Sequence, residues 1–306
     1  MPKFADRLAK ARTNPALAWA LIKGQFWKPF RALRYVGAVD NRSISDDGLY
    51  AAFCDTASHS DAFRMFKRHP HYVAILEHVT KEEGAEYLEA IEAMEPGLLA
   101  QIDTFKVNDM VGCPIVHEYP GVGRISPTTL RYMKVVADLQ RYFGGHAIRQ
   151  IAEIGVGYGA QLLVTDRVMT FDNWHLFDLP SVLKLASRYL ESHILNNAYC
   201  AHTLNQVVGG EKYDLVISNY AYSELPSALQ EVYARKVLAN ASRGYLTMNS
   251  GREGCVFAGN HLSLERLREI LPSFEIFEEH PLTARRNYIL VWGHGTPRNT
   301  LQAARG

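Results

Sequence analysis

A short run of glycines holds the residues whose types and spacing point most clearly to chemistry. Glycines stand at positions 155, 157 and 159, directly after an apolar stretch that ends at Ile154. Such glycines let the backbone turn tightly and let a ligand approach without interference from a Cβ atom. Asp178 ends the next apolar stretch, where a carboxylate is placed to accept hydrogen bonds from both hydroxyls of a ribose. A glycine loop between strand and helix, followed by such an acid, predicts a site for a nucleoside-bearing cofactor.

The glycine spacing favours one class of cofactor. A dinucleotide fingerprint reads GxGxxG, whereas Gly155-x-Gly157-x-Gly159 is one residue shorter and has Glu153 two positions before it. This pattern resembles motif I of class I S-adenosylmethionine-dependent methyltransferases. Phe177-Asp-Leu-Pro180 resembles the FDLP segment of small-molecule O-methyltransferases, and 213–219 resembles the family's fourth strand. The resemblance covers about residues 145–293.

Two short segments narrow the resemblance further. Residues 218–225 (SNYAYSEL), taken with 124–132 (RISPTTLRY), are similar to the sugar O-methyltransferase family of bacterial glycan modification. That resemblance implies S-adenosylmethionine as methyl donor and a sugar or glycoconjugate as acceptor.

The resemblance also implies the cofactor contacts. The methionine end would lie against Glu153, Gly155, Gly157 and Gly159. Asp178 would take the ribose, with Leu179 beside the adenine and Thr203 and Leu204 near its edge. Asn219 and Tyr220 would flank the sulfonium, where an aromatic face can make a cation–π contact.

Methylation of a hydroxyl calls for a group that takes the acceptor's proton, and a base typically adds about 10²–10⁴-fold in rate. Plant-type O-methyltransferases that share the FDLP segment carry a His–Asp pair after the fourth strand, but this chain has Ser223-Glu224 there. The candidate bases are Glu224, given a pKa raised by burial, His261 beyond the fifth strand, and His117 in the loop-rich stretch before the sheet. Helix capping is the alternative for Glu224, and an ordinary surface or core position is the alternative for each histidine.

Two further side chains are candidates for binding the acceptor. Arg124 offers a planar fork of donors to an anionic or hydroxylated acceptor, with a local salt bridge as the alternative. Tyr222 either faces the acceptor or packs in the core. Metal dependence stays open and no metal ligand is assigned, because acidic residues do not cluster. The four cysteines are scattered without a CxxC pair, which argues against a disulfide framework and a cysteine-based zinc site.

The elements that must position these residues divide the chain into two parts. Residues 1–144 predict helices, including one over 127–143 that Ser126 caps and Pro127 opens. From residue 145 to 306, short apolar runs alternate with helical stretches and predict an α/β, Rossmann-like parallel sheet. Residues 274–277 and 287–292 lack a helix between them and predict an antiparallel pair at one edge of the sheet. The first part would cover the acceptor site or form a dimerisation arm.

Positive charge gathers in residues 1–34, which hold eight cations and one anion in a chain of net charge +1. Interleaved aromatic residues predict a basic amphipathic arm on an anionic membrane surface or a lipid-linked substrate. The alternative is an arm that packs on the body or a partner subunit and exposes its lysines. The balanced total charge argues against a nucleic-acid partner. Because the chain shows neither a membrane-span run nor a signal-peptide pattern, we expect a cytoplasmic protein, with membrane contact at the inner face left open.

The sequence leaves four functions to weigh. The first is an S-adenosylmethionine-dependent O-methyltransferase that acts on a sugar hydroxyl. The second keeps the methyl donor and changes the acceptor to a natural-product hydroxyl or an amine. The third is a non-catalytic subunit that binds S-adenosylmethionine. The fourth, a nicotinamide-dependent oxidoreductase, is disfavoured by the glycine spacing.

Overall fold

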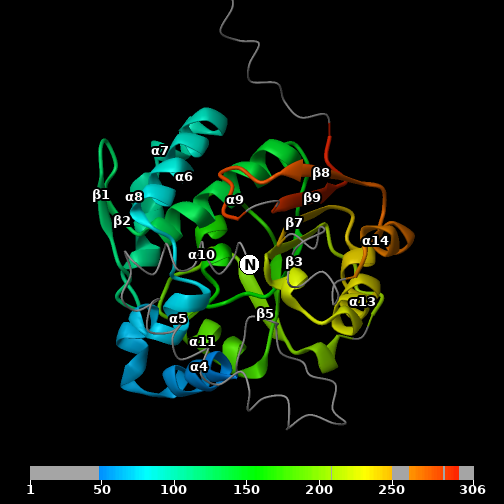
Figure 1. Cartoon of the computed structure of the whole chain (residues 1–306), viewed down its shortest axis with the longest axis horizontal. Helices are drawn as coiled ribbons and strands as arrows, with labels where there is room; N and C mark the ends of the chain where they lie inside the picture. Colours follow the sequence, from blue (N-terminus) through cyan, green and yellow to red (C-terminus); the bar gives the residue numbers. More distant parts are fainter. Residues whose placement is uncertain (1–47, 208, 250–261, 285–286, 296–306) are drawn as a thin grey trace, which may run out of the picture.

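The computed structural model describes residues 48–207, 209–249, 262–284 and 287–295 (Figure 1). The basic arm over 1–34 and the candidate base His261 lie outside these ranges.

A seven-stranded sheet with the order β5-β4-β3-β6-β7-β9-β8 forms the centre of the molecule. Its strands are β3 (Gln150–Ile154), β4 (Asn173–Phe177), β5 (Ala198–His202), β6 (Leu215–Asn219), β7 (Gly244–Met248), β8 (Phe274–Glu278) and β9 (Tyr288–Trp292). The strands from β3 to β7 pair in parallel, and β9 runs antiparallel to both β7 and β8. The α/β class, the parallel sheet and the antiparallel C-terminal edge pair predicted from the sequence are confirmed.

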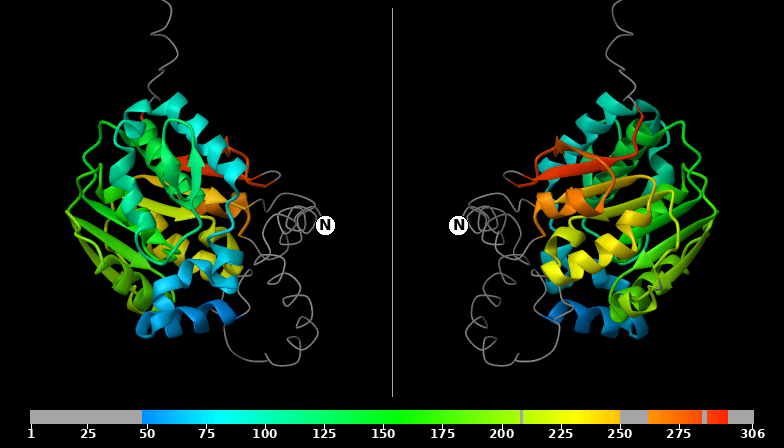
Figure 2. Two further views of the ribbon diagram at one scale, coloured as in Figure 1. Left: turned by 90° about the vertical axis from the view of Figure 1, so that its left-hand side faces the viewer. Right: turned by 90° about the vertical axis from the view of Figure 1, so that its right-hand side faces the viewer.

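Helices cover both faces of the sheet (Figures 1 and 2). One core cluster joins a sheet face to α9 (Pro127–Phe143), α10 (Ala160–Asp166) and α11 (Pro180–Leu190). The other face packs against α12 (Ala221–Glu224), α13 (Ser227–Lys236), the short η4 (Leu238–Asn240) and α14 (Leu264–Ile270). Buried apolar side chains on both faces explain why the central strands read as nearly continuous apolar runs.

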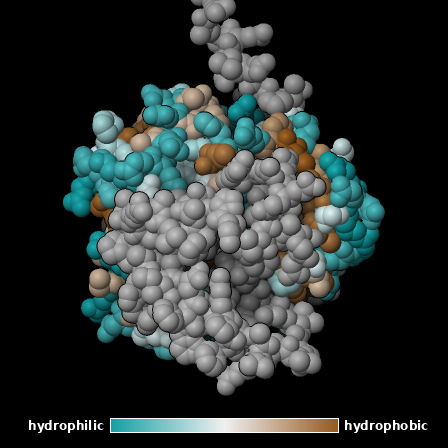
Figure 3. All heavy atoms as spheres, viewed as in Figure 1, coloured by the Kyte–Doolittle hydropathy of each residue, from teal (hydrophilic) through white to brown (hydrophobic). Residues whose placement is uncertain are grey.

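The N-terminal helices form an outer layer on the α9 side. They are α4 (Leu49–His59), η1 (Asp61–Arg68), α5 (Pro70–Ile75), α6 (Lys81–Met94), α7 (Pro96–Leu99), α8 (Ile102–Phe105) and η2 (Lys106–Asp109). Thr80 and Glu83 form a reciprocal capping box at the start of α6. The outward side of α6 carries exposed glutamates, and hydrophilic residues cover this upper left part of Figure 3.

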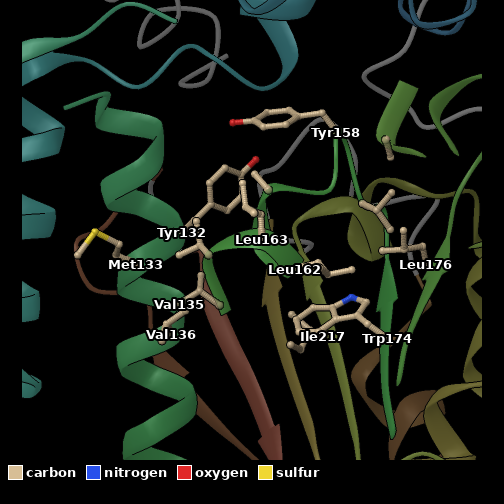
Figure 4. Close-up of a cluster of buried hydrophobic side chains, with 14 of the residues drawn as sticks. Tyr132, Met133, Val135, Val136, Tyr158, Leu162, Leu163, Trp174, Leu176 and Ile217 are labelled. Atoms are coloured by element: carbon tan, nitrogen blue, oxygen red, sulfur yellow. The ribbon is translucent and has the colours of Figure 1, made fainter. Parts of the chain in front are cut away.

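Helix α9 has the bounds that its sequence predicts. The Ser126 hydroxyl accepts a hydrogen bond from the Thr128 N–H at 3.3 Å, and Pro127 occupies the first turn. Almost all of the helix is buried, because α6 packs on one side of it and α10 on another. Its side chains belong to the same cluster as Trp174 and Ile217 of the sheet, so one core runs across residue 144 (Figure 4).

The loop-rich stretch before α9 contains a hairpin that the sequence analysis missed. Strands β1 (His117–Tyr119) and β2 (Gly123–Ile125) pair antiparallel around a turn. The side chain of Tyr119 is buried, and its hydroxyl donates to the carbonyl of Lys81 at 3.1 Å. This anchor lies far away in the sequence, so local glycine and proline signals predict only a loop.

Among the described residues, no helix is both long and apolar enough to cross a membrane.

Candidate functional site

Four parallel strands bring the predicted cofactor residues to one edge of the sheet. Ile154 pairs with Phe177, and Phe177 pairs with His202, while Glu153 pairs with Ile217. Thr203, Asp178 and Gly155, which directly follow their strands, and Asn219, the last residue of β6, are therefore neighbours in that spatial order. Ligands of open α/β sheets bind at such carboxyl ends, where the strand order reverses.

The glycine loop needs its glycines for both conformation and space. Gly155, Gly157 and Gly159 have φ values of +80°, +56° and +85°, a region that other residues rarely adopt. A Cβ atom on Gly155 would lie 1.9 Å from the Cβ atom of Ala221, so the loop and the start of α12 are in close contact. A Cβ atom on Gly157 would lie 3.0 Å from the side chain of Leu76. The end of α5 thus covers the loop from the helical layer.

Asp178 holds the glycine loop in place. Its Oδ2 accepts the Val156 N–H at 2.8 Å, and its Oδ1 accepts the Leu179 N–H at 2.7 Å. Asp178 and Leu179 are partly exposed, so a ligand over the loop can reach both. Next to Asp178, Thr203 caps η3 (Leu204–Gln206) through reciprocal bonds with Gln206.

Tyr158 anchors the same loop from within. Its ring is fully buried and lies 4.9 Å from the ring of Tyr189. The ammonium of Lys67, itself buried, lies 4.4 Å above the Tyr158 ring. Burial lowers the pKa of Lys67 to about 8, against the opposing charges of Glu77 and Asp109. The glycine loop is therefore fixed to both the sheet and the N-terminal helices.

Glu153 lies in the core rather than on an exposed ligand surface. Its side chain is buried, and its Oε2 accepts the indole N–H of Trp174 at 3.0 Å. Burial raises the pKa of Glu153 well above its ordinary value, although the Trp174 hydrogen bond acts in the opposite direction. The buried carboxyl of Glu153 therefore fastens the end of β3 to Trp174 of β4, and this position does not favour contact with the methionine end of a cofactor.

Asn219 carries a buried polar atom that lacks a partner in the described part of the chain. Its Nδ2 donates to Gln161 Oε1 at 3.1 Å, which ties the end of β6 to α10. Its Oδ1 is buried and has no hydrogen-bond partner among the described residues. Orphaned buried acceptors are costly and call for an explanation, and a bound ligand with a donor group supplies one.

Tyr220 has a strained backbone at the same place. Its φ is +68°, which is rare for a residue with a side chain and is typical of functional positions. Its hydroxyl donates to Glu279 and lies 3.2 Å from Thr283 Oγ1. Burial, followed by the nearby Glu279, raises the pKa of Tyr220 well above its ordinary value. Tyr220 is therefore a neutral hydrogen-bond donor at physiological pH.

A pocket opens beside these two residues, on the side of β6 away from Asp178. It encloses about 360 Å³, including its open mouth. Its lining combines tyrosine rings with a guanidinium, a carboxylate and an imidazole. These side chains include Tyr87, Arg131, Tyr220, Glu279 and His280. Arg131 also donates to the Leu76 carbonyl at 2.9 Å, so the segment that covers Gly157 helps to position the pocket.

Of the five side chains just named, sequence reasoning predicted only Tyr220 as a site residue and missed Tyr87, Arg131, Glu279 and His280. Arg131 lies inside α9, in the 124–132 segment but not singled out there, and Glu279 and His280 follow β8, where no local motif marks them. Glu279 is buried and accepts bonds from Tyr220 and Thr283, whereas His280 is exposed at the pocket. The segment 124–132 resembles the sugar O-methyltransferase family. Among the described residues, Arg131 and Tyr132 are the members of this segment that line the pocket.

The predicted residues after β6 have different surroundings. Tyr222 is fully buried and its hydroxyl donates to the Gln230 carbonyl at 3.0 Å, so the core alternative holds and contact with an acceptor does not. Glu224 is partly buried at the end of α12, and its Oε1 accepts from Asn249 Nδ2 at 2.7 Å. Glu224 thus stays at the carboxyl edge of the sheet as a candidate.

The hairpin residues lie apart from this edge. His117 and Arg124 belong to β1 and β2, which stand at the left margin of Figure 1, on the outside of the helical layer. Arg124 is exposed there. The structure does not bring His117 or Arg124 together with the glycine loop.

Comparisons with known proteins give distant likenesses. No family model and no curated protein matches the chain. Among solved structures, CalS10 with bound S-adenosylmethionine, an amino pentose methyltransferase from Micromonospora echinaspora, is 14% identical with a TM-score of 0.39 and covers 53% of this chain and 89% of its own. The N-methyltransferase NodS from Bradyrhizobium japonicum, in complex with S-adenosylhomocysteine, is 17% identical with a TM-score of 0.37 and covers 53% and 83%. Precorrin 8w decarboxylase from Methanobacterium thermoautotrophicum is 14% identical with a TM-score of 0.37 and covers 52% and 88%. These values assign neither a family nor an activity to the chain.

Proposed function

We propose that this protein is an S-adenosylmethionine-dependent methyltransferase that transfers a methyl group to a hydroxyl of a sugar or glycoconjugate. The observation that carries the proposal is the arrangement at the carboxyl edge of the sheet. Asp178 and the glycine loop lie on one side of Asn219, and the tyrosine-lined pocket lies on the other. A donor site and an acceptor site thus meet at Asn219 and Tyr220.

The residues present fit the proposed methyl donor. Asp178 holds the glycine loop through the Val156 N–H and is partly exposed, and a bound ribose would lie against its carboxylate. The unpaired Oδ1 of Asn219 suits a donor group of either ligand. When bound, S-adenosylmethionine supplies an electrophilic methyl group on a positively charged sulfur. The chain's own contribution is to align an acceptor oxygen opposite that sulfur.

The pocket supports a hydroxylated acceptor. Arg131 presents several fixed donors, and Tyr87 and Tyr220 add hydroxyl groups and ring faces. Ring faces pack well against the apolar side of a sugar. An aromatic phenol would also fit between tyrosine rings, so the acceptor class needs a direct test.

The acceptor proton needs a base, and the described pocket offers His280. His280 is exposed where the pocket opens, so its imidazole can pass a proton to solvent. Glu279 is occupied by Tyr220 and Thr283 and serves to position the tyrosine. Glu224 at the same edge and His261, outside the described residues, remain candidates from the sequence, whereas His117 on the β1–β2 hairpin lies apart from this edge.

A transfer assay tests the proposal. Purified protein is incubated with methyl-labelled S-adenosylmethionine and with free, nucleotide-linked and lipid-linked sugars, phenols and amines. We expect label in a sugar acceptor, and we expect His280→Ala to lower kcat by about 10²-fold or more with little change in cofactor affinity. His59→Ala, which removes an exposed histidine of α4, is the matched control. Transfer only to phenols or amines would replace the acceptor class. Cofactor binding without transfer to any acceptor would favour a non-catalytic subunit.

A further inference from the structure

A cluster of metal-ligating side chains lies on the sheet away from the proposed acceptor pocket. His175 is in the middle of β4, and Cys200 and His202 are on the neighbouring edge strand β5. His175 pairs directly with Cys200 across the parallel ladder. All three side chains project to the same face, because residues two apart on a strand share a face and paired residues align. Sequence spacing does not reveal the cluster, since its two strands are 25 residues apart at this pair.

The three potential ligand atoms converge on one point. Cys200 Sγ lies 3.2 Å from His175 Nδ1 and 3.0 Å from His202 Nε2. The two imidazole nitrogens lie 3.3 Å apart. A tetrahedral zinc ion with bonds of about 2.0–2.1 Å to nitrogen and about 2.3 Å to sulfur would separate two nitrogens by about 3.3 Å and nitrogen from sulfur by about 3.6 Å. The observed distance between the two nitrogens matches that of a zinc site, and Cys200 Sγ would need to move away from the nitrogens by a few tenths of an ångström.

A fourth ligand stands next to the cluster. Glu211 Oε1 lies 3.7 Å from His175 Nδ1. The other carboxylate oxygen of Glu211 accepts the Tyr213 hydroxyl at 2.9 Å, which holds the first oxygen toward the cluster. Cys200 and His202 are partly exposed beside the edge strand, so an ion can reach the site from solvent.

Polar side chains next to His175 contact its Nε2 atom. Its Nε2 lies 3.0 Å from Gln150 Oε1, an acceptor that favours a proton on Nε2 and leaves Nδ1 as the ligand atom. Asn173 Nδ2 lies 3.2 Å from the same Nε2, where it favours the opposite tautomer, and it donates to Cys200 Sγ at 3.3 Å. An amide that donates to the sulfur also stabilises a thiolate.

We propose that His175, Cys200 and His202 form a binding site for Zn²⁺, with Glu211 or a water molecule in the fourth position. A thiolate with two imidazoles is a ligand set that suits zinc. On binding, Cys200 forms a sulfur–zinc bond and releases its thiol proton to solvent. The ion would join β4, β5 and the segment before β6. Phe177, one residue before Asp178, stacks on His202 at a centroid distance of 5.2 Å. The metal would thus brace the strand ends next to the ribose carboxylate.

Metal analysis of the full chain without an affinity tag tests this site. The protein is stripped with a chelator and titrated with Zn²⁺ against a chromophoric competitor. We expect one tightly bound ion per chain, and we expect Cys200→Ser and His202→Asn each to weaken zinc affinity at least about tenfold. Cys113→Ser and His59→Asn are the matched controls and should leave affinity unchanged. Gln150→Leu should weaken zinc binding by about 10–100-fold, because it removes the oxygen next to His175 Nε2.

Cobalt substitution gives a readout that does not require a variant to be well folded. Co²⁺ in the wild-type chain should show a thiolate-to-metal charge-transfer absorption and the strong visible bands of a tetrahedral ion. Both signals should persist in Cys113→Ser. Absence of tight zinc binding in the wild type, or zinc and cobalt binding unchanged in Cys200→Ser, would overturn the proposal and leave a hydrogen-bonded polar cluster. S-adenosylhomocysteine affinity, measured on the same samples, reports separately on the proposed function.

Discussion

The carboxyl group of Glu153 lies in the core, 3.0 Å from the indole nitrogen of Trp174. Its raised pKa means that the folded chain keeps the carboxyl proton to a higher pH than the unfolded chain does. Between the ordinary pKa and the raised one, the unfolded state binds fewer protons, so Glu153 lowers stability as pH increases through that window. Below the ordinary pKa of a glutamate, the folded and unfolded states are both protonated at Glu153, so this residue then causes no loss of stability.

Glu153→Gln should therefore stabilise the protein near neutral pH. The amide oxygen can still accept from Trp174, and the penalty for a buried carboxylate disappears. We expect a gain on the order of 1 kcal/mol or more in the free energy of unfolding at about pH 7, which vanishes at about pH 4. Urea unfolding at both pH values measures it.

A contrasting variant separates charge from hydrogen bonding. Glu153→Ala leaves the Trp174 N–H without its acceptor and opens space, so it should destabilise the chain by about 1–3 kcal/mol. A wild type more stable than Glu153→Gln at neutral pH would show that the ionised carboxylate is favourable at this position.

Local signals predict a group of site residues together only where one segment of the chain contains all of them. Asp178 and the glycines are recognisable because the loop, its strand and its helix are contiguous. Arg131, Glu279 and His280 meet at the pocket from α9 and the segment after β8, and no short pattern joins them. Tyr222 lies close in sequence to Tyr220, yet its hydroxyl is directed to Gln230 in the core. Neighbours in sequence are thus separated by the turn into α12.

At the scale of elements, the glycine loop and the β6–α12 turn depend on each other's shape. Gly155 and Gly121 have similar positive φ values of +80° and +73°. A Cβ on Gly155 would collide with Ala221, whereas a Cβ on Gly121 would meet nothing within 4 Å. Alanine substitutions at Gly155 and Gly121 therefore share the backbone strain, and only the one at Gly155 adds a steric clash.

Gly155→Ala should cost more stability than Gly121→Ala. The left-handed conformation alone costs about 1–2 kcal/mol for alanine, and the collision with Ala221 should add about 1–3 kcal/mol. Chemical unfolding of both variants gives the difference, and S-adenosylhomocysteine titration should show weaker binding only for Gly155→Ala. Equal losses for both variants would show that the loop and α12 adjust freely.

The sequence predicts the bounds of an element where capping residues set them. It does not predict an element or a cluster that depends on a partner far away in the sequence. Ser126 and Pro127 define the start of α9 through bonds within one turn. The β1–β2 hairpin depends on Tyr119 reaching the carbonyl of Lys81, and the His175–Cys200–His202 cluster depends on the pairing of β4 with β5. Such contacts become visible only after the chain has folded.

At the scale of the whole molecule, the helical region and the sheet share one core. Phe66 of η1 lies 5.5 Å from the ring of Tyr158 in the glycine loop, and α9 packs between the N-terminal helices and α10. The division at residue 144 that the sequence predicts is thus crossed by buried contacts.

Calorimetry of the full chain should show one cooperative unfolding transition. A shared core makes the loss of either part expose the other, so the calorimetric and van't Hoff enthalpies should agree. Two resolved transitions would mean that residues 1–144 and 145–306 unfold as separate domains.

The basic arm adds a prediction about partners, which rests on its charge alone. Full-length protein should sediment with anionic lipid vesicles, and removal of residues 2–34 should abolish that binding. Neutral vesicles and raised salt serve as controls, because an electrostatic contact weakens in both. Vesicle binding that survives removal of the arm would assign the contact to another surface.

Calorimetric titration with S-adenosylhomocysteine tests the central claim most directly. The wild type should bind it with micromolar affinity and should not bind NADH. Asp178→Ala should weaken binding by at least about tenfold, because it removes a ribose acceptor and the carboxylate that holds Val156. Asp172→Ala, which removes an exposed acid just before β4, should leave the affinity unchanged. Absence of S-adenosylhomocysteine binding by the folded wild type, or equal affinity in wild type and Asp178→Ala, would contradict the account.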